Sequence, residues 1–275
     1  MNDDTMIILE DVTKKYGGQT IFRHFNFTIP NGKTLLIGPN GTGKTTLLSM
    51  MCGLKYANSG KISCFSFDTV KDIVKIRNRV SYVPSEGDFP LDLTLQDLLN
   101  YAVTFSSQNL IENYLSLLDI ESLLKKQPKY MSSGEKKLVR IAFGLFMKRS
   151  LLILDEPLIN IDKRRKYRIM KLLDQENANI ILTSHSDEFI FSGQYNLIKI
   201  KKINEREGSR MVLERSTKKA FKIRVTDEEM VSSILKENSI DFEREEGEFV
   251  ILEPTLELFS RIFQYITDYR RVITD

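Results

Sequence analysis

Cysteine is scarce in this chain of 275 residues, which contains only Cys52 and Cys64. The two residues lack CxxC spacing and have no neighbouring histidines, so the sequence excludes a disulfide framework and a zinc site of the usual spacing. Two isolated thiols in a chain of this length favour a reducing compartment. We therefore expect a cytosolic protein.

A large excess of charge of either sign is also missing, because 40 basic residues face 37 acidic ones. Proteins that bind nucleic acid usually carry a strongly basic domain or stripe. The bulk charge gives no support to such a partner, and we expect no nucleic acid to be bound.

Long apolar runs are absent as well. The longest apolar stretches, at 141–146 and 151–154, fall far short of the roughly 20 residues that a membrane-spanning helix needs. Residues 1–6 include Asp3 and Asp4 rather than the basic start and apolar run of a signal peptide. We expect a chain that does not cross a membrane by itself.

The pattern of apolar residues predicts alternating strands and helices up to about residue 203. An antiparallel hairpin over 7–29 leads into a core strand at 33–37 and a helix at 44–52. Strand patterns follow at 61–67, 80–83, 151–154 and 180–183, with a helix at 162–173 before the last of them. Between residues 90 and 149 helical spacing replaces the strand pattern, which indicates a helical insert.

The remaining residues, 204–275, are rich in charge and form a candidate second domain. Their pattern predicts a strand at 219–225, a helix at 227–237, a strand at 242–252 and a helix at 256–267. Residues 204–209 would serve as a linker. We therefore divide the chain into residues 1–203 and a small α+β domain at 204–275.

A glycine-rich motif lies between the predicted strand 33–37 and the following helix, and it matches G-x-x-x-x-G-K-[ST]. In this motif the backbone N–H groups wrap phosphates, the lysine reaches the terminal phosphates and the hydroxyl residue binds Mg²⁺. A plain glycine-rich turn is the alternative. The nucleotide-binding residues expected here are Gly38, Pro39, Asn40, Gly41, Thr42, Gly43, Lys44, Thr45 and Thr46.

Two carboxylates, Asp155 and Glu156, close the apolar strand 151–154. This arrangement can place the first acid on Mg²⁺ and the second beside the attacking water, as a general base. An apolar strand closed by Asp-Glu is common in α/β proteins, but the phosphate loop strengthens the functional interpretation. The expected metal ligands are Thr45 and Asp155, and the expected catalytic residues include Lys44 and Glu156.

Together with the sequence Met131-Ser132-Ser133-Gly134-Glu135, these motifs resemble the ATP-binding cassette (ABC) family over about residues 6–202. The five residues are similar to the signature loop of that family, Leu-Ser-Gly-Gly-Gln, with three substitutions. The resemblance implies that Ser132, Gly134 and Glu135 contact ATP bound to a second subunit. The alternative is an ordinary N-cap of the helix that follows.

Further positions fit the family order. The resemblance implies that Tyr16 stacks on adenine, although a hairpin tyrosine can simply pack at the surface. His185 takes the position of the switch histidine near the γ-phosphate and is the third catalytic candidate; a local structural partner is its alternative. Asn160 to Asp162 occupies the intersubunit loop, and Asp162 could equally cap a helix.

The chain departs from the family at Tyr82-Val83-Pro84-Ser85-Glu86, where the family has a glutamine that touches Mg²⁺ and senses the membrane partner. Either Ser85 or Glu86 must replace it. We assign Ser85 as a metal ligand that could act through water. The substitution concerns coupling to a partner more than nucleotide binding.

The expected fold is α/β, with a phosphate-loop NTPase core, an N-terminal antiparallel β subdomain, a helical insert and the small C-terminal domain. The resemblance implies an ATPase that uses ATP and Mg²⁺, forms a homodimer or heterodimer, and drives a multi-span permease from the inner face of the membrane. Residues 93–99 look like the exporter branch. A soluble ATPase acting on ribosomes or DNA, and a phosphate-loop kinase or regulator, are the alternatives.

Overall fold

The fold is described here from a computed structural model. It covers residues 5–87, 92–102, 104, 106–185, 195–204, 208–214, 220–238, 240, 242–245, 248–252, 262 and 265–272. The helices in these ranges are α1 (Lys44–Met51), α2 (Ile73–Arg77), α3 (Leu95–Ala102), α4 (Gln108–Leu118), α5 (Ser133–Phe146), α6 (Lys163–Gln175) and α7 (Glu228–Glu237).

The first sheet is antiparallel and has the order β2-β1-β4-β5. It consists of β1 (Thr5–Tyr16), β2 (Gln19–Pro30), β4 (Ser59–Cys64) and β5 (Phe67–Asp68). Its apolar face packs around α1, whose Leu47, Leu48 and Met51 are fully buried. The N-terminal antiparallel subdomain is thereby confirmed, and it supports the helix that follows the phosphate loop.

The central sheet has the order β10-β9-β3-β8-β7-β6, and only β10 runs antiparallel to its neighbour. Its strands are β3 (Lys33–Ile37), β6 (Val80–Val83), β7 (Leu151–Leu154), β8 (Asn179–Ser184), β9 (Tyr195–Asn204) and β10 (Gly208–Glu214). All four residues of β7 are buried, as expected for a parallel strand covered on both faces.

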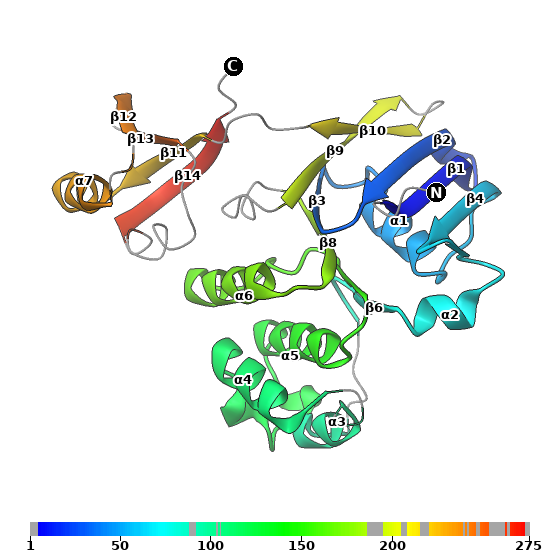
Figure 1. Cartoon of the computed structure of the whole chain (residues 1–275), viewed down its shortest axis with the longest axis horizontal. Helices are drawn as coiled ribbons and strands as arrows, with labels where there is room; N and C mark the ends of the chain where they lie inside the picture. The colour runs from blue at the N-terminus through cyan, green and yellow to red at the C-terminus, as the bar shows by residue number, and fades with distance from the viewer. Residues whose placement is uncertain are drawn as a thin grey trace.

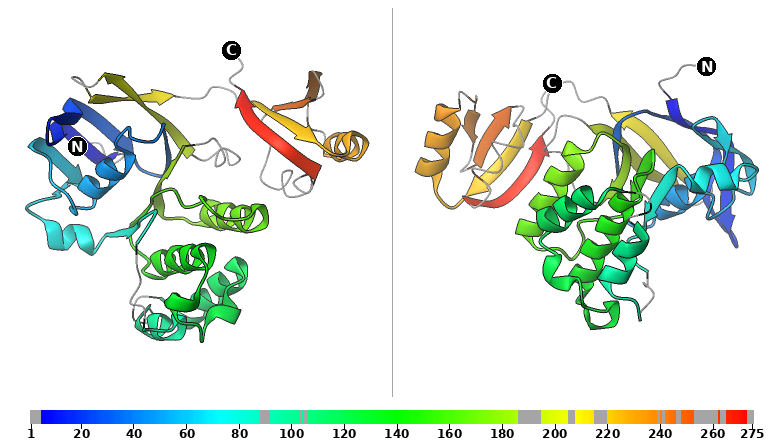
Figure 2. Two further views of the ribbon diagram at one scale, coloured as in Figure 1. Left: turned by 180° about the vertical axis from the view of Figure 1, so that it is seen from behind. Right: turned by 60° about the horizontal axis from the view of Figure 1, so that its bottom comes forward.

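The two faces of the central sheet belong to different cores. Leu151 and Ile153 pack with α1 and the first sheet, whereas Leu152 and Leu154 pack with the helical insert. This alternation follows from the two-residue period of a strand. Figures 1 and 2 show α3, α4 and α5 gathered at one end of the molecule and the antiparallel sheet around α1 at another. The predicted α/β core with a helical insert is confirmed.

A third sheet, with the order β12-β13-β11-β14, carries α7. It consists of β11 (Ala220–Val225), β12 (Phe242–Glu245), β13 (Glu248–Leu252) and β14 (Ile266–Val272). The single strand predicted over 242–252 is wrong, because these residues form two paired antiparallel strands. Most of the helix predicted at 256–267 lies outside the described residues, and its last two residues belong to β14 instead.

The linker predicted at 204–209 is also wrong. Asn204 ends β9, Gly208 begins β10, and the two residues pair across the hairpin. The chain therefore continues the central sheet beyond residue 203. The division of the chain into two domains stays a prediction, and the hairpin favours a boundary after β10.

Candidate nucleotide-binding and hydrolysis site

The phosphate loop connects the end of β3 with the first residue of α1. Gly41 and Gly43 adopt left-handed backbone conformations with φ of 79° and 95°. A Cβ atom at Gly43 would lie 2.5 Å from Cγ2 of Ile21, so this position also needs glycine for space. The helix begins without a side-chain cap. Its N-terminus is a suitable site for phosphate.

Lys44 places its ammonium inside this loop. The Nζ atom donates to the carbonyl oxygens of Gly38 at 2.6 Å and Pro39 at 3.2 Å, and it lies 3.4 Å from Oε1 of Glu156. Only 5% of the Lys44 side chain is exposed. The loop thus holds a buried cation opposite a carboxylate.

Asp155 connects the phosphate loop to the central sheet. Its carboxylate is buried and accepts hydrogen bonds from the Thr45 hydroxyl at 2.7 Å and the Thr183 hydroxyl at 2.6 Å. The three residues meet because α1, β7 and β8 all present their ends at the carboxyl edge of the parallel strands. Hydroxyl and carboxylate oxygens are the hard ligands that Mg²⁺ prefers, so Thr45 and Asp155 fit this ion.

Glu156 follows Asp155 with an unusual left-handed backbone, φ 47°. Its N–H donates to the Thr183 hydroxyl at 2.9 Å. Its carboxylate, 14% exposed, lies between Lys44 and His185, whose Nδ1 is 3.6 Å from Oε2. The structure therefore brings together all three residues predicted as catalytic, and their chemical roles stay predictions.

Tyr16, predicted to stack on adenine, lies beside α1. Partial burial acts to raise the pKa of Tyr16, but hydrogen bonds from Thr46 and Lys55 and the charges of Lys55 and Lys14 outweigh it and lower the pKa. The ammonium of Lys14 lies 4.8 Å from the ring centroid. Tyr16 is 42% exposed, which leaves apolar surface for a base near the phosphate loop.

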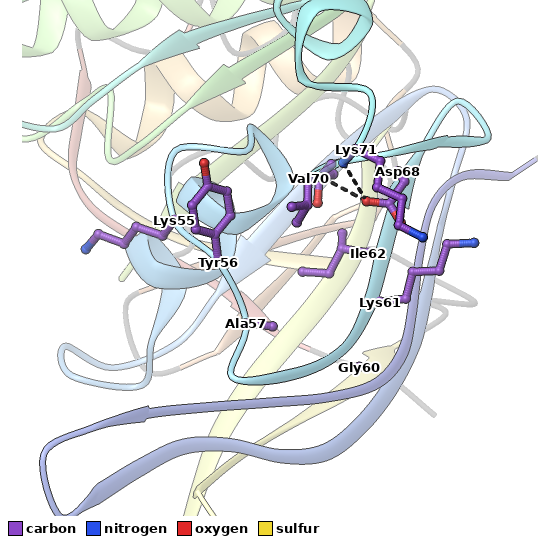
Figure 3. Close-up of a pocket in the computed structure, with 10 residues that line it drawn as sticks. Lys55, Tyr56, Ala57, Gly60, Lys61, Ile62, Asp68, Val70 and Lys71 are labelled. Carbon is purple, nitrogen blue, oxygen red and sulfur yellow. Dashed lines mark hydrogen bonds between the residues drawn. The ribbon is translucent and has the colours of Figure 1, made fainter.

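A pocket of about 280 Å³ adjoins this region between residues 55–57 and the strands β4 and β5 (Figure 3). In it the carboxylate of Asp68 accepts the N–H groups of Val70 and Lys71. Lys55 is the lining residue that also contacts Tyr16. The phosphate loop contributes nothing to this pocket.

Ser132 forms the N-cap of α5. Its hydroxyl accepts the N–H of Glu135 at 3.2 Å, while the Glu135 carboxylate accepts the N–H of Ser132 at 2.7 Å and pairs with Lys126 at 2.9 Å. The helix cap expected as the alternative is therefore present. It leaves the hydroxyl proton of Ser132 able to bond an anion. Contact with a nucleotide of a second subunit stays a prediction for Ser132, Gly134 and Glu135.

The loop after Glu156 also ends in a helix cap, because Asp162 accepts the N–H of Arg165 at 3.0 Å at the start of α6. Within the loop, Asn160 has a positive φ of 60°. A Cβ atom on Gly134 would lie 3.5 Å from the carbonyl oxygen of Asn160. The loop thus passes close to the start of α5.

The substituted glutamine position lies after β6. The N–H of Asp155 donates to the carbonyl of Val83 at 2.9 Å, which keeps this segment next to the site. Gly87 accepts a hydrogen bond from Arg140 at 2.7 Å, and the charge of Glu86 acts on the pKa of Lys137. Metal binding by Ser85 stays a prediction.

Sequence reasoning missed three residues of the site. The first is Thr183, whose hydroxyl bonds both Asp155 and Glu156. The second is Tyr82, which hydrogen-bonds Ser49 and Asp155 and whose pKa is strongly raised by burial. The third is Lys137, which donates to the carbonyl of Glu156. A polar residue among the apolar residues of a buried strand or helix face was the signal available for each.

The fold and the loop between β3 and α1 define a phosphate-loop nucleoside triphosphatase. The ABC transporter family pattern matches residues 22–159, about half of the chain. An ABC transporter ATP-binding protein of Archaeoglobus fulgidus is 33% identical over 196 residues, which cover 67% of the chain and 82% of the relative. The chain therefore belongs to the ABC transporter family, and it is an ATPase of that family.

A further relative and a solved structure are also similar to the chain. A Pyrococcus furiosus protein in the same class is 26% identical over 283 residues, covering 98% of the chain and 96% of the relative. A dimeric ATP-binding cassette bound to ADP and phosphate shares the fold with a TM-score of 0.64, at 21% identity over 76% of the chain and 99% of that protein.

Other relatives differ in the process for which they are named. Proteins 28–30% identical over 66–70% of the chain are named for linearmycin resistance in Bacillus subtilis, Fe(3+) import in Escherichia coli and ribosome protection in B. subtilis. Membership of the family thus leaves the direction of transport open. Among the described helices, each is too short or too polar to span a membrane.

Proposed function

We propose that the chain is the ATP-hydrolysing subunit of an exporter, that it pairs with a second ATPase subunit, and that it drives a separate multi-span permease from the inner face of the cell membrane. The observation that supports the hydrolytic part of this proposal most directly is the 2.7 Å contact between Thr45 and Asp155, with Glu156 3.4 Å from Lys44. These contacts join a phosphate loop to two acids that hydrolysis requires.

In this proposal the backbone of residues 38–45 wraps the phosphates of ATP, and the ammonium of Lys44 moves from the loop carbonyls to the terminal phosphates. Tyr16 stacks on the adenine. Thr45 and Asp155, with Ser85 as a further candidate, hold Mg²⁺, whose charge neutralises the phosphate oxygens when it is bound.

Hydrolysis itself is assigned to Glu156. Its carboxylate takes a proton from the attacking water, and His185 at its other oxygen orients the carboxylate and bonds the γ-phosphate. Ser132 and Gly134 complete the site from the second subunit. Because each subunit supplies half of each site, ATP binding closes the dimer and release of phosphate reopens it.

Glu156→Gln tests the hydrolytic part of this proposal. The amide cannot accept the proton, so we expect turnover to fall by on the order of 10²–10⁴-fold while ATP still binds. Size-exclusion chromatography with ATP and Mg²⁺ should then show a trapped dimer. A monomeric variant with undiminished turnover would rule out Glu156 as the base.

The transport part needs a different measurement. A tagged chain purified from detergent-solubilised membranes should carry a multi-span protein in a fixed ratio, and the ATPase rate of that complex should respond to its transported compound. Recovery with ribosomes and without a membrane protein would instead favour the soluble alternative.

A further inference from the structure

A buried cation lies on α5, away from the phosphate loop. Lys137, in the second turn of this helix, is only 5% exposed. Its Nζ donates to the carbonyl oxygen of Glu156 at 2.7 Å and to that of Ile159 at 3.4 Å. One ammonium therefore holds both ends of the turn that carries the proposed base.

The backbone that Lys137 holds is strained. Glu156 and Asn160 have φ values of 47° and 60°, which side-chain-bearing residues rarely adopt. Such conformations persist where surrounding contacts fix them, and they concentrate at functional sites. At Glu156 the N–H is fixed by the Thr183 hydroxyl and the carbonyl by Lys137. Each backbone polar group of the proposed base thus has its own side-chain partner.

The charges around Lys137 explain how a lysine is tolerated there. Burial and the nearby charge of Arg140 lower the pKa of Lys137, whereas the charges of Glu156, Asp155 and Glu86 act in the opposite direction. Three acids of the site therefore favour the protonated form. A neutral side chain at this position would lose both carbonyl contacts and leave these acids with less compensation.

The same helix contacts the other segments that surround the base. Arg140, one turn after Lys137, donates to the carbonyl of Gly87 at 2.7 Å. Gly134, one turn before it, lies against the carbonyl of Asn160. The N-cap of the helix is Ser132, the residue proposed to face the nucleotide of a second subunit. A shift of α5 would therefore move the backbone of Glu156 directly.

We propose that Lys137 is a positioning residue for hydrolysis: it fixes the backbone of Glu156 and links the position of α5 to the position of the Glu156 carboxylate. This inference rests on the proposed role of Glu156 as the general base. It concerns a hydrogen bond within one subunit, between the helix that Ser132 caps and the turn that follows β7.

The test compares Lys137→Met with Lys136→Met, a matched change at the neighbouring helix position. A misplacement of about 1 Å can cost on the order of 10²-fold in rate. We expect Lys137→Met to lower kcat by up to that factor with the KM for ATP unchanged, and Lys136→Met to keep both values. A Lys137→Met enzyme with wild-type kcat would overturn the proposal, whether or not its KM for ATP has changed.

Variants at the base separate positioning from a general loss of structure. If Lys137 acts through Glu156, adding Lys137→Met to Glu156→Gln should cause no further loss of turnover, whereas independent, multiplying losses would overturn the proposal. Lys137→Arg keeps the charge and donors and should recover part of kcat; an arginine variant as slow as the methionine variant would count against it. Full turnover in Glu156→Gln alone would refute the base assignment and not the Lys137 contacts.

Thermal unfolding of each variant shows whether it is folded. Should Lys137→Met fail to fold, Lys137→Gln takes its place, because the shorter amide cannot reach both carbonyls but remains polar. The same loss of kcat at unchanged KM supports the proposal in that variant, and wild-type kcat refutes it.

Discussion

The N-termini of α1 and α5 are both assigned to phosphate, yet the two helices begin in different ways. At α1 the first positions are glycine and a buried lysine, without a side-chain cap and without an acid in the first turn. At α5 a serine and a glutamate of the same helix cap each other, and Lys126 neutralises the acid. The first end is ready to bind an anion alone, whereas the second has satisfied part of its own backbone.

The difference indicates that the two helix N-termini contribute differently to binding the phosphates of ATP. An uncapped helix N-terminus with a buried cation can supply binding energy for the phosphates of ATP. A capped end with one available hydroxyl proton is suited to complete a site rather than to create one. We therefore expect changes at the α1 end to abolish binding and changes at the α5 end to have smaller effects within one subunit.

The largest effect is expected for Lys44→Ala. The change removes the buried cation of the phosphate loop, which the proposed function places on the terminal phosphates of ATP. Loss of one member of a buried charge pair costs about 2–5 kcal/mol, so ATP affinity should fall by about 30-fold or more. Titration calorimetry measures this, with Lys61→Ala on the exposed part of β4 as control. Unchanged affinity in Lys44→Ala would remove the distinction between the two helix ends.

A mixture of two inactive subunits tests whether the α5 end acts across a dimer. Ser132→Arg and Lys44→Ala each damage both sites of their own homodimer, but their heterodimer keeps one intact site. With random pairing, at most about a quarter of the wild-type sites are recovered. Single-turnover hydrolysis measures this recovery. Full restoration, or none in a mixture shown to form heterodimers, would contradict the trans arrangement.

The phosphate-binding character of the α1 N-terminus was predictable because the residues that produce it are neighbours in the sequence. Eight consecutive residues from Gly38 to Thr45 specify the loop. The apolar run 151–154 predicts the length and the burial of the strand that the structure shows. An N-cap at the start of α5 was also expected as an alternative, and the structure shows that Ser132 and Glu135 form a capping box. Local patterns thus gave both helix starts.

Contacts between distant segments were not predictable in the same way. Thr183 lies 27 residues from Glu156 and reaches it only because β7 and β8 are neighbours in the sheet. The predicted linker 204–209 overlaps the end of β9 and the start of β10, because the charged residues there mask the strand pattern. The single strand predicted over 242–252 overlooked the short Glu-Gly turn signal at 246–247, between β12 and β13.

Thr183→Val tests the hydrogen bonds that hold Asp155 and Glu156 next to the N-terminus of α1, and it should have an intermediate effect. The change removes the hydroxyl that bonds Asp155 and leaves the N–H of Glu156 without its partner, which costs about 1–3 kcal/mol of unfolding free energy. Thermal unfolding should show a Tm lower by about 2–4 °C for each kcal/mol. Thr34→Val is the matched control, because the buried hydroxyl of Thr34 has no hydrogen-bond partner among the residues that the structure describes, and its loss should be neutral or stabilising.

The smallest effect is expected at the α5 end, for Glu135→Gln. Burial acts to raise the pKa of Glu135, but the hydrogen bond from Ser132 and the ion pair with Lys126 outweigh it, so the pKa lies below its ordinary value of 4.5. A lowered pKa in the folded state means that the carboxylate stabilises the fold above pH 4.5 and loses this effect as the pH falls through the folded-state pKa. A partly exposed pair of this kind contributes about 0.2–1 kcal/mol.

Denaturant unfolding should therefore find Glu135→Gln slightly less stable than the wild type at pH 7 and equal to it at strongly acidic pH. A loss of stability that persists in acid would show that α5 depends on Glu135 for more than its charge.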